Sequence, residues 1–218
     1  MNRVMRDYVP KIGERVEAAS RLVKKCDRLV DVGCGNGIIA HFIGNRVSHI
    51  FGVDSSKKML KQAVKRGLRV KFVDLDAEKI PFKDNYFDVA TCLDVIEHVK
   101  DPKDLLIKIH RVLKKNGILI LSTPNIRFTN HIYNLVVNGR FPKTSLDTSL
   151  YDGGHLHFLT YTDALNLIEQ TGYSLVIKEG IINKRTRGWK GRVLEFILGK
   201  DLMLEFRAPG ILLVCKKL

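Results

Sequence analysis

Short apolar runs alternate with amphipathic segments along much of the chain. Runs that are apolar throughout predict strands buried on both faces of a parallel sheet. Apolar residues spaced three and four apart predict helices that cover such a sheet. Strand and helix alternate from residue 28 to residue 122, which indicates right-handed βαβ units. The expected strands in this part are residues 28–32, 49–53, 69–73, 87–93 and 118–121.

Capping residues set the bounds of the longest expected helix. Asp101 is a favourable N-cap and Pro102 suits the first turn, the apolar stripe runs on through Leu113, and Gly117 ends it. After residue 125 the regular alternation lapses, and no linker rich in Pro, Gly or Ser divides the chain. We therefore predict one domain over residues 1–218. Its less regular parts are an N-terminal helical region (1–28), an insertion (125–160), a helix (162–172), strands at 173–178 and 211–216, and a basic excursion (183–208).

The composition fits a soluble globular domain, with 45% hydrophobic residues among 218. The longest apolar runs are far shorter than the roughly 20 residues that cross a bilayer. Residues 1–8 are charged and lack the apolar core of a signal peptide. The four cysteines are scattered with no CxxC pair. We therefore expect a cytoplasmic protein with reduced thiols.

The most informative string is LVDVGCGNG at residues 29–37, where a strand delivers three glycines to the start of a helix. Glycine is needed where the backbone turns sharply and a ligand must approach closely. The next strand ends in Asp54, where a carboxylate can accept both hydroxyls of a ribose. A nicotinamide-binding loop would need its third glycine one position later, where this chain has Ile38.

The GxGxG pattern preceded by Asp31 resembles motif I of the class I S-adenosylmethionine-dependent methyltransferases. The resemblance covers residues 28–125 and continues loosely to 178. Within that superfamily the chain is most similar to the ubiquinone-biosynthesis O-methyltransferases, in the type 11 methyltransferase group. This resemblance implies an α/β, doubly wound, Rossmann-like three-layer sandwich with a mostly parallel seven-stranded sheet and an antiparallel last strand. The further segments that carry it are residues 76–82, 85–88, 92–99 and 116–125.

The resemblance also implies S-adenosyl-L-methionine as the cofactor. Asp54 would hold its ribose and Asp76 its adenine amino group, with Asp74 as a rival because the register is uncertain by two residues. Asp31 either orients the glycine loop or touches the cofactor's amine. The predicted cofactor-binding residues are Asp31, Gly33, Cys34, Gly35, Gly37, Asp54, Ser55, Asp76, Ala77, Leu93 and Asp94.

The methyl acceptor is expected where the fourth and fifth strands end. Asp94, Glu97 and His98 share one face of a helical turn, and His155 lies at the end of the insertion. We predict His98 and His155 as the catalytic residues, which take a proton from the acceptor. These four side chains could also hold a divalent cation. Because Glu-His occurs at this place in similar methyltransferases that need no metal, we assign none. Tyr133, Tyr151 and Phe158 could stack on an acceptor or pack in the ordinary way.

We predict methyl transfer to an oxygen of a small or lipid-linked acceptor. The alternative is a metal-assisted RNA methyltransferase, because the small-RNA 3′-terminal 2′-O-methyltransferases hold a divalent ion with Glu-x-x-Glu-His and a later His. This chain has Asp94 in place of the first Glu. A cofactor-binding adapter without catalytic activity is a third hypothesis.

The formal net charge of +14 is unevenly spread. Residues 123–182 carry four basic and five acidic side chains, whereas residues 183–218 carry nine and three. An RNA substrate would need phosphate contacts beside the acceptor, so nucleic acid is not the favoured partner. The basic run at 183–192 and the amphipathic stretch at 193–198 could instead contact an anionic membrane surface.

Overall fold

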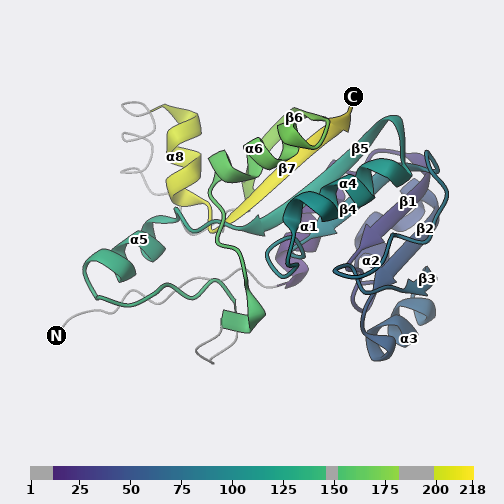
Figure 1. The fold of residues 1–218 in the computed structure, drawn as a ribbon, viewed down its shortest axis with the longest axis horizontal. Coiled ribbons are helices and arrows are strands. Elements are labelled where there is room, and N and C mark those ends of the chain that lie inside the picture. Colours follow the sequence, from purple (N-terminus) through teal and green to yellow (C-terminus); the bar gives the residue numbers. More distant parts are fainter. Residues whose placement is uncertain (1–11, 146–151, 182–198) are drawn as a thin grey trace.

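The computed structural model describes residues 12–145, 152–181 and 199–218 (Figure 1). Tyr151 and the segments 183–192 and 193–198, to which the sequence analysis gave candidate roles, lie outside these ranges. The strands are β1 (Cys26–Val32), β2 (Val47–Asp54), β3 (Arg69–Phe72), β4 (Phe87–Leu93), β5 (Leu113–Pro124), β6 (Tyr173–Ile181) and β7 (Gly210–Lys217). The helices are α1 (Ile12–Leu22), α2 (Ile39–Ile43), α3 (Lys57–Lys65), α4 (Pro102–Val112), α5 (Thr129–Val136), α6 (Tyr161–Gln170) and α8 (Lys200–Arg207), with 3-10 turns η1 (Gly44–Arg46) and η2 (Asp152–Gly154).

The strands form one sheet in the order β3-β2-β1-β4-β5-β7-β6. Neighbouring strands from β3 to β5 pair in parallel. The last strand, β7, runs antiparallel to both β5 and β6. The predicted doubly wound sheet with an antiparallel last strand is confirmed. Because the strand order reverses between β1 and β4, the carboxyl ends of these strands border the crevice where such sheets bind ligands.

Alternate residues of the strands face two separate layers of helices. Leu29 of β1 packs into a cluster with residues of α1 and α2, whereas Val30 and Val32 pack with residues of α4 and α6. This alternation is the two-residue period of a strand applied to a sheet that is covered on both faces. The apolar runs that predicted the strands therefore serve both layers.

The boundary between α4 and β5 differs from the prediction. We expected Leu113 in the helix and a stop at Gly117, but α4 ends at Val112 and Leu113 already pairs with Phe87 of β4. The register then shifts, so that Val89 pairs with Ile118, and Asn116 takes a φ of +62° within the shifted segment. Leu113 is buried in either arrangement, so apolar spacing alone could not distinguish the two.

Two further elements differ slightly from their predicted bounds. The helix expected at 162–172 is α6, which begins at Tyr161 and ends at Gln170, and Thr160 caps it through a capping box with Asp163. The strand expected at 173–178 continues to Ile181, where it pairs with Gly210 of β7.

Residues 125–145 and 152–160, here called the arm, leave the sheet after β5 and carry α5. The side-chain amide of Asn125 donates to the carbonyl oxygens of Glu205 (2.6 Å) and Ala208 (2.8 Å), and the Thr129 hydroxyl donates to that of Phe206 (2.7 Å). These bonds tie the arm to α8. The two helices lie at one extremity of the molecule, far from α3 (Figure 1). Among the described helices, none has the length and apolarity needed to cross a bilayer.

Candidate active site

The glycine loop joins β1 to α2 at the carboxyl edge of the sheet. The backbone N–H groups of Gly33 and Cys34 both donate to the carbonyl oxygen of Val53, which ties the loop to the end of β2 (2.8 and 3.0 Å). Gly33 has a φ of +73°, and a Cβ there would lie 2.3 Å from Val95 Cγ2. Any other residue at this position would strain the backbone and displace Val95.

Asp54 ends β2 directly beside this loop. Its Oδ2 accepts the backbone N–H of Gly35 and its Oδ1 accepts that of Ser56, both at 2.8 Å. These two bonds fix the carboxylate in the position that sequence analysis predicted, at a strand end next to the glycines. Asp54 also lines a pocket, and its oxygens keep lone pairs that these two bonds do not use.

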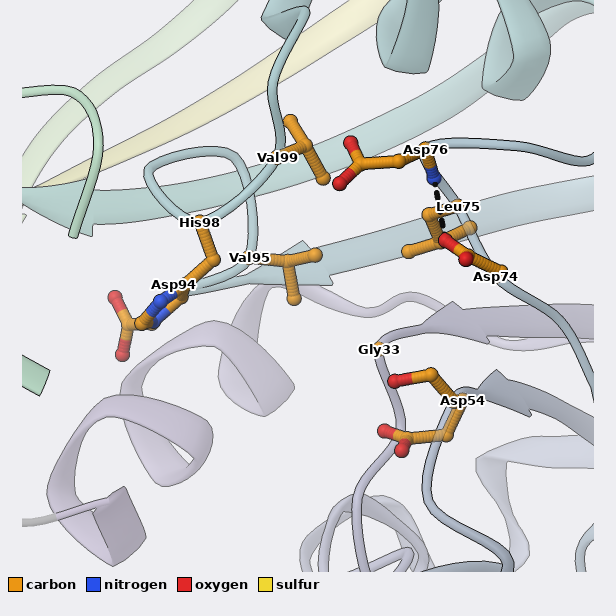
Figure 2. Close-up of a pocket in the computed structure, with 10 residues that line it drawn as sticks. Gly33, Asp54, Asp74, Leu75, Asp76, Asp94, Val95, His98 and Val99 are labelled. Atoms are coloured by element: carbon orange, nitrogen blue, oxygen red, sulfur yellow. Dashed lines mark hydrogen bonds between the residues drawn. The ribbon is translucent and has the colours of Figure 1, made fainter. Parts of the chain in front are cut away.

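Two adjoining pockets form the crevice, and Gly33 and Asp94 line both of them. The first has a volume of about 300 Å³ and the second about 370 Å³. In the first, the carboxylates at the ends of β2 and β3 lie at one end, and Asp94 and His98 lie at the other (Figure 2). The first pocket is lined by Gly33, Asp54, Ser55, Asp74, Leu75, Asp76, Asp94, Val95, His98 and Val99, and the second by Val16, Asp31, Gly33, Cys34, Gly35, Asn36, Ile38, Ile39, Met59, Leu93 and Asp94.

Most of the predicted cofactor residues meet in this crevice. Asp74 and Asp76 both line the first pocket, and the Asp74 carboxylate accepts the backbone N–H of Asp76 at 3.0 Å (Figure 2). The structure does not bring Gly37 and Ala77 to the lining of either pocket. Gly37 has a φ of +73° and a Cβ there would lie 2.9 Å from the Ala63 backbone, so this glycine permits close packing of the loop against α3.

Asp31 is a buried acid at the floor of the second pocket. Thr91 of β4 donates its hydroxyl to Asp31 Oδ1 at 2.7 Å. Burial raises the pKa of Asp31 from 3.8 to about 7; the Thr91 hydrogen bond opposes this rise and the nearby Asp54 adds to it. The carboxyl group is therefore partly protonated near pH 7, and a positive charge in the pocket would favour its ionised form.

Asp31 should make the stability of the ligand-free protein depend on pH. Between pH 3.8 and about 7 the folded chain keeps a proton that the unfolded chain has lost. The contribution of Asp31 to the free energy of unfolding should therefore fall by up to about 1.4 kcal/mol for each pH unit in this window and level off above it. Urea titrations at pH 5 and pH 8 should show that Asp31→Asn gains stability relative to wild type as the pH rises. The exposed Glu78→Gln is the control, and an equal response of the two variants would contradict the assignment.

Sequence reasoning missed the contact of Arg15 with Asp94. Arg15 lies on α1, is buried, and its Nη1 is 2.6 Å from Asp94 Oδ2. Asp94 also accepts the Ser122 hydroxyl at 3.1 Å and holds a φ of +53°. Arg15 Nε has no hydrogen-bond partner among the described residues. No motif in the sequence around Arg15 indicates a role in the site. Arg15 reaches Asp94 only because α1 folds over the second pocket.

The histidine cluster lies beyond Asp94. One ligand atom from each of Glu97, His98 and His155 lies within 4.8 Å of the others. The His98 and His155 rings meet edge to face with centroids 4.6 Å apart. Thr123 donates to Glu97 Oε2 at 3.1 Å, whereas Glu97 Oε1 is buried without a partner among the described residues. Burial, and secondly the negative charge of Asp94, raise the pKa of Glu97.

The same three side chains fit a divalent cation. Two imidazole nitrogens and one carboxylate oxygen are a donor set suited to zinc and similar ions, and Glu97 Oε1 is an orphaned buried acceptor. Asp94, the fourth ligand considered from the sequence, is instead paired with Arg15. The three side chains could therefore either hold a divalent cation or transfer a proton.

Comparison with known proteins narrows the class of reaction that this site could catalyse. Residues 30–121 match the family model described as a methyltransferase domain. A ubiquinone biosynthesis O-methyltransferase of Rickettsia typhi is 25% identical over 199 residues, covering 87% of this chain and 77% of that protein. The S-adenosylmethionine-dependent methyltransferase of Mesorhizobium loti has the same fold, with a TM-score of 0.62 and 19% identity over 92% of this chain and 96% of the other. Together these findings identify the chain as an S-adenosylmethionine-dependent methyltransferase.

The methyltransferase uses S-adenosyl-L-methionine, and its crevice suits that cofactor. The sulfonium and the ammonium of the cofactor are positive, and the two pockets are lined by the carboxylates of Asp31, Asp54, Asp74, Asp76 and Asp94. The fold by itself does not determine the reaction. The [4+2]-cyclase SpnF has the same fold, with a TM-score of 0.63 and 18% identity, covering 97% of this chain and 86% of that one. The acceptor must therefore be argued from the site.

Proposed function

We propose that the methyltransferase holds the adenosine part of its cofactor between Asp54 and Asp76, and the amino-acid part along the glycine loop. Asp54 is already oriented by two backbone N–H groups. Asp76 is favoured over Asp74 for the adenine because the Asp74 carboxylate closes the turn by accepting the Asp76 N–H. Asp31 lies under the second pocket, where an ammonium group would favour its ionised form.

We further propose an oxygen of a small or lipid-linked molecule as the methyl acceptor. The observation that carries this proposal is a row of contacting rings that begins at the exposed His98, which lines the first pocket, and ends at the exposed Phe141. His98 meets His155 at 4.6 Å, His155 meets Phe158 at 6.4 Å, and Phe158 meets Phe141 at 5.0 Å between centroids. Such a row of rings suits an aromatic acceptor or one with an apolar chain. The name of the Rickettsia typhi relative, which refers to ubiquinone biosynthesis, agrees with this chemistry.

The bound cofactor supplies an electrophilic methyl group on sulfur. His98 lines the first pocket, where an imidazole nitrogen can take the hydroxyl proton of the acceptor as its oxygen forms the new bond. His155 packs edge-on against His98, and its own Nδ1 is 2.7 Å from the Thr144 hydroxyl. The arm thus holds His155 in place, and His155 in turn limits where the His98 ring can lie.

The proposal is tested with methyl-labelled cofactor and a phenol that carries a prenyl chain. We expect labelled phenyl methyl ether and one equivalent of S-adenosylhomocysteine, with faster turnover than for the same phenol without the chain. The product is located by mass spectrometry. Label on nitrogen, or transfer to RNA but not to either phenol, would show that the acceptor class is wrong.

A divalent cation at Glu97, His98 and His155 is a second candidate for the group that activates the acceptor. The orphaned Glu97 Oε1 favours it. A cation here would lower the pKa of the acceptor hydroxyl as a Lewis acid. The phenol assay distinguishes the two candidates after dialysis against a chelator: loss of turnover that zinc or magnesium restores indicates the cation, and unchanged turnover indicates the imidazole alone.

A further inference from the structure

The return segment of the arm, residues 153–158, crosses the turn that follows β4, residues 94–99. The backbone N–H groups of Leu156 and His157 both donate to the carbonyl oxygen of Glu97, at 2.8 and 3.1 Å. Several residues of this turn line the first pocket. The same turn therefore belongs both to the crevice and to the support of the arm.

The side chain of His157 makes a second contact with this turn. Its Nε2 lies 2.9 Å from the carbonyl oxygen of Val99. Because a carbonyl oxygen only accepts, Nε2 carries a hydrogen and donates it. Two backbone bonds to one oxygen form a single point about which the return segment can turn. The bond from the ring to Val99 adds a second point, and two points fix the direction of the segment.

The chain just before His155 is made of glycines, which restrain it little. Gly153 and Gly154 have φ values of +70° and +79°, a region that glycine enters at no steric cost. The rings of His155 and His157 both contact the turn, the first against the ring of His98 and the second as described above. The direction of the return segment therefore influences where His155 lies against His98.

The return segment also reaches His98 through its backbone. The carbonyl oxygen of Gly154 lies 3.4 Å from His98 Nδ1. His98 is the residue that would take the proton of the acceptor, so a shift of the return segment would move two neighbours of this ring, Gly154 and His155. His157 itself lines neither pocket and so can act on the reaction only through these residues.

We propose that His157 is a positioning residue that fixes the return segment on the turn after β4 and so couples the first pocket to the acceptor side. Val99 lines that pocket, so a cofactor bound there lies against the residue whose oxygen receives the bond from His157. The fixing of the segment is independent of the acceptor, whereas its effect on turnover rests on the function proposed above.

Hydrogen exchange of the full-length protein, followed by NMR, tests the proposal without any acceptor. The readout is the exchange rate of the Leu156 amide, whose N–H bonds to Glu97. His157→Phe keeps a ring of similar size and removes the donor, whereas His157→Gln places an amide N–H near the position of Nε2. We expect about three- to tenfold faster exchange in His157→Phe and near wild-type exchange in His157→Gln.

Addition of S-adenosylhomocysteine tests the coupling. It should slow exchange of the Leu156 amide about threefold or more in wild type and in His157→Gln, and less in His157→Phe. His41→Phe makes the same replacement at an exposed histidine that lines neither pocket, and it should behave as wild type. Calorimetric binding of S-adenosylhomocysteine, expected to stay within about threefold of wild type, shows that each variant is folded.

Unchanged exchange in His157→Phe, or an equal rise in His157→Gln, would overturn the proposal, because the hydrogen bond would then not hold the segment. So would an equal effect of S-adenosylhomocysteine in wild type and His157→Phe. With the prenylated phenol, His157→Phe should lower kcat about three- to tenfold at an unchanged KM for the cofactor, and His157→Gln should restore it. If wild type left the phenol unmethylated, the proposed acceptor would be wrong, and the exchange rates would still decide the role of His157.

Discussion

Asp54→Ala is expected to weaken the binding of S-adenosylhomocysteine about a hundredfold while leaving the fold intact. The carboxylate orders the loop through the N–H groups of Gly35 and Ser56, and in our proposal it also accepts the ribose hydroxyls. A hydrogen bond to a charged group contributes about 1.5–3 kcal/mol, and about 3 kcal/mol corresponds to a hundredfold change in affinity. Titration calorimetry measures the affinity, and circular dichroism the fold.

Two milder changes at the same place serve as controls for Asp54. Asp54→Asn keeps an oxygen for one of the two backbone N–H groups and should give an intermediate affinity. Ser55→Ala alters an exposed side chain at the edge of the pocket and should change the affinity by no more than about threefold. A folded Asp54→Ala protein with wild-type affinity would refute the assignment of the ribose to this residue.

His98→Ala is expected to lower kcat about 100- to 10,000-fold, the usual contribution of a positioned acid or base. Cofactor affinity should change little, because the loop, Asp54 and Asp76 remain. The measurement is steady-state turnover with the prenylated phenol, together with calorimetric binding of S-adenosylhomocysteine. His155→Ala should give a smaller loss of kcat, since in our proposal His155 positions the His98 ring.

His41→Ala is the matched control for these two variants. His41 is an exposed histidine on α2 and lines neither pocket. Its loss should leave both kcat and cofactor affinity at wild-type levels. If His98→Ala turned over as fast as His41→Ala, the proton would have to leave the acceptor by another route, and the catalytic assignment of His98 would be wrong.

The crevice was predictable because its geometry follows from short-range rules. Gly33 and Gly35 indicate a turn after β1, and Asp54 ends β2. Because β1 and β2 are parallel neighbours, the turn and the strand end lie at the same edge of the sheet. The pocket lining confirms that these residues meet. Only the third glycine, Gly37, has a different setting, since it packs against α3 and lies outside the pocket lining.

Features set by packing between distant segments were not predictable. Arg15 and Asp94 are 79 positions apart and meet because α1 covers the second pocket. The helix α5 lies within the insertion at 125–160, whose elements were not predicted one by one. Its buried residues are the polar His131 and Asn134, so no buried apolar stripe indicates it in the sequence. Apolar spacing also did not locate the start of β5 at Leu113, which would be buried in either a helix or a strand.

The anchoring of Asn125 by Glu205 and Ala208 has a bearing on how the enzyme is made. The glycine loop and Asp54 come well before Glu205 and Ala208 along the chain. A nascent chain can therefore assemble its cofactor-binding part early. The arm, which in our proposal lies beside the acceptor, takes its final shape only after Glu205 and Ala208 have been synthesised and β7 has paired with β5 and β6.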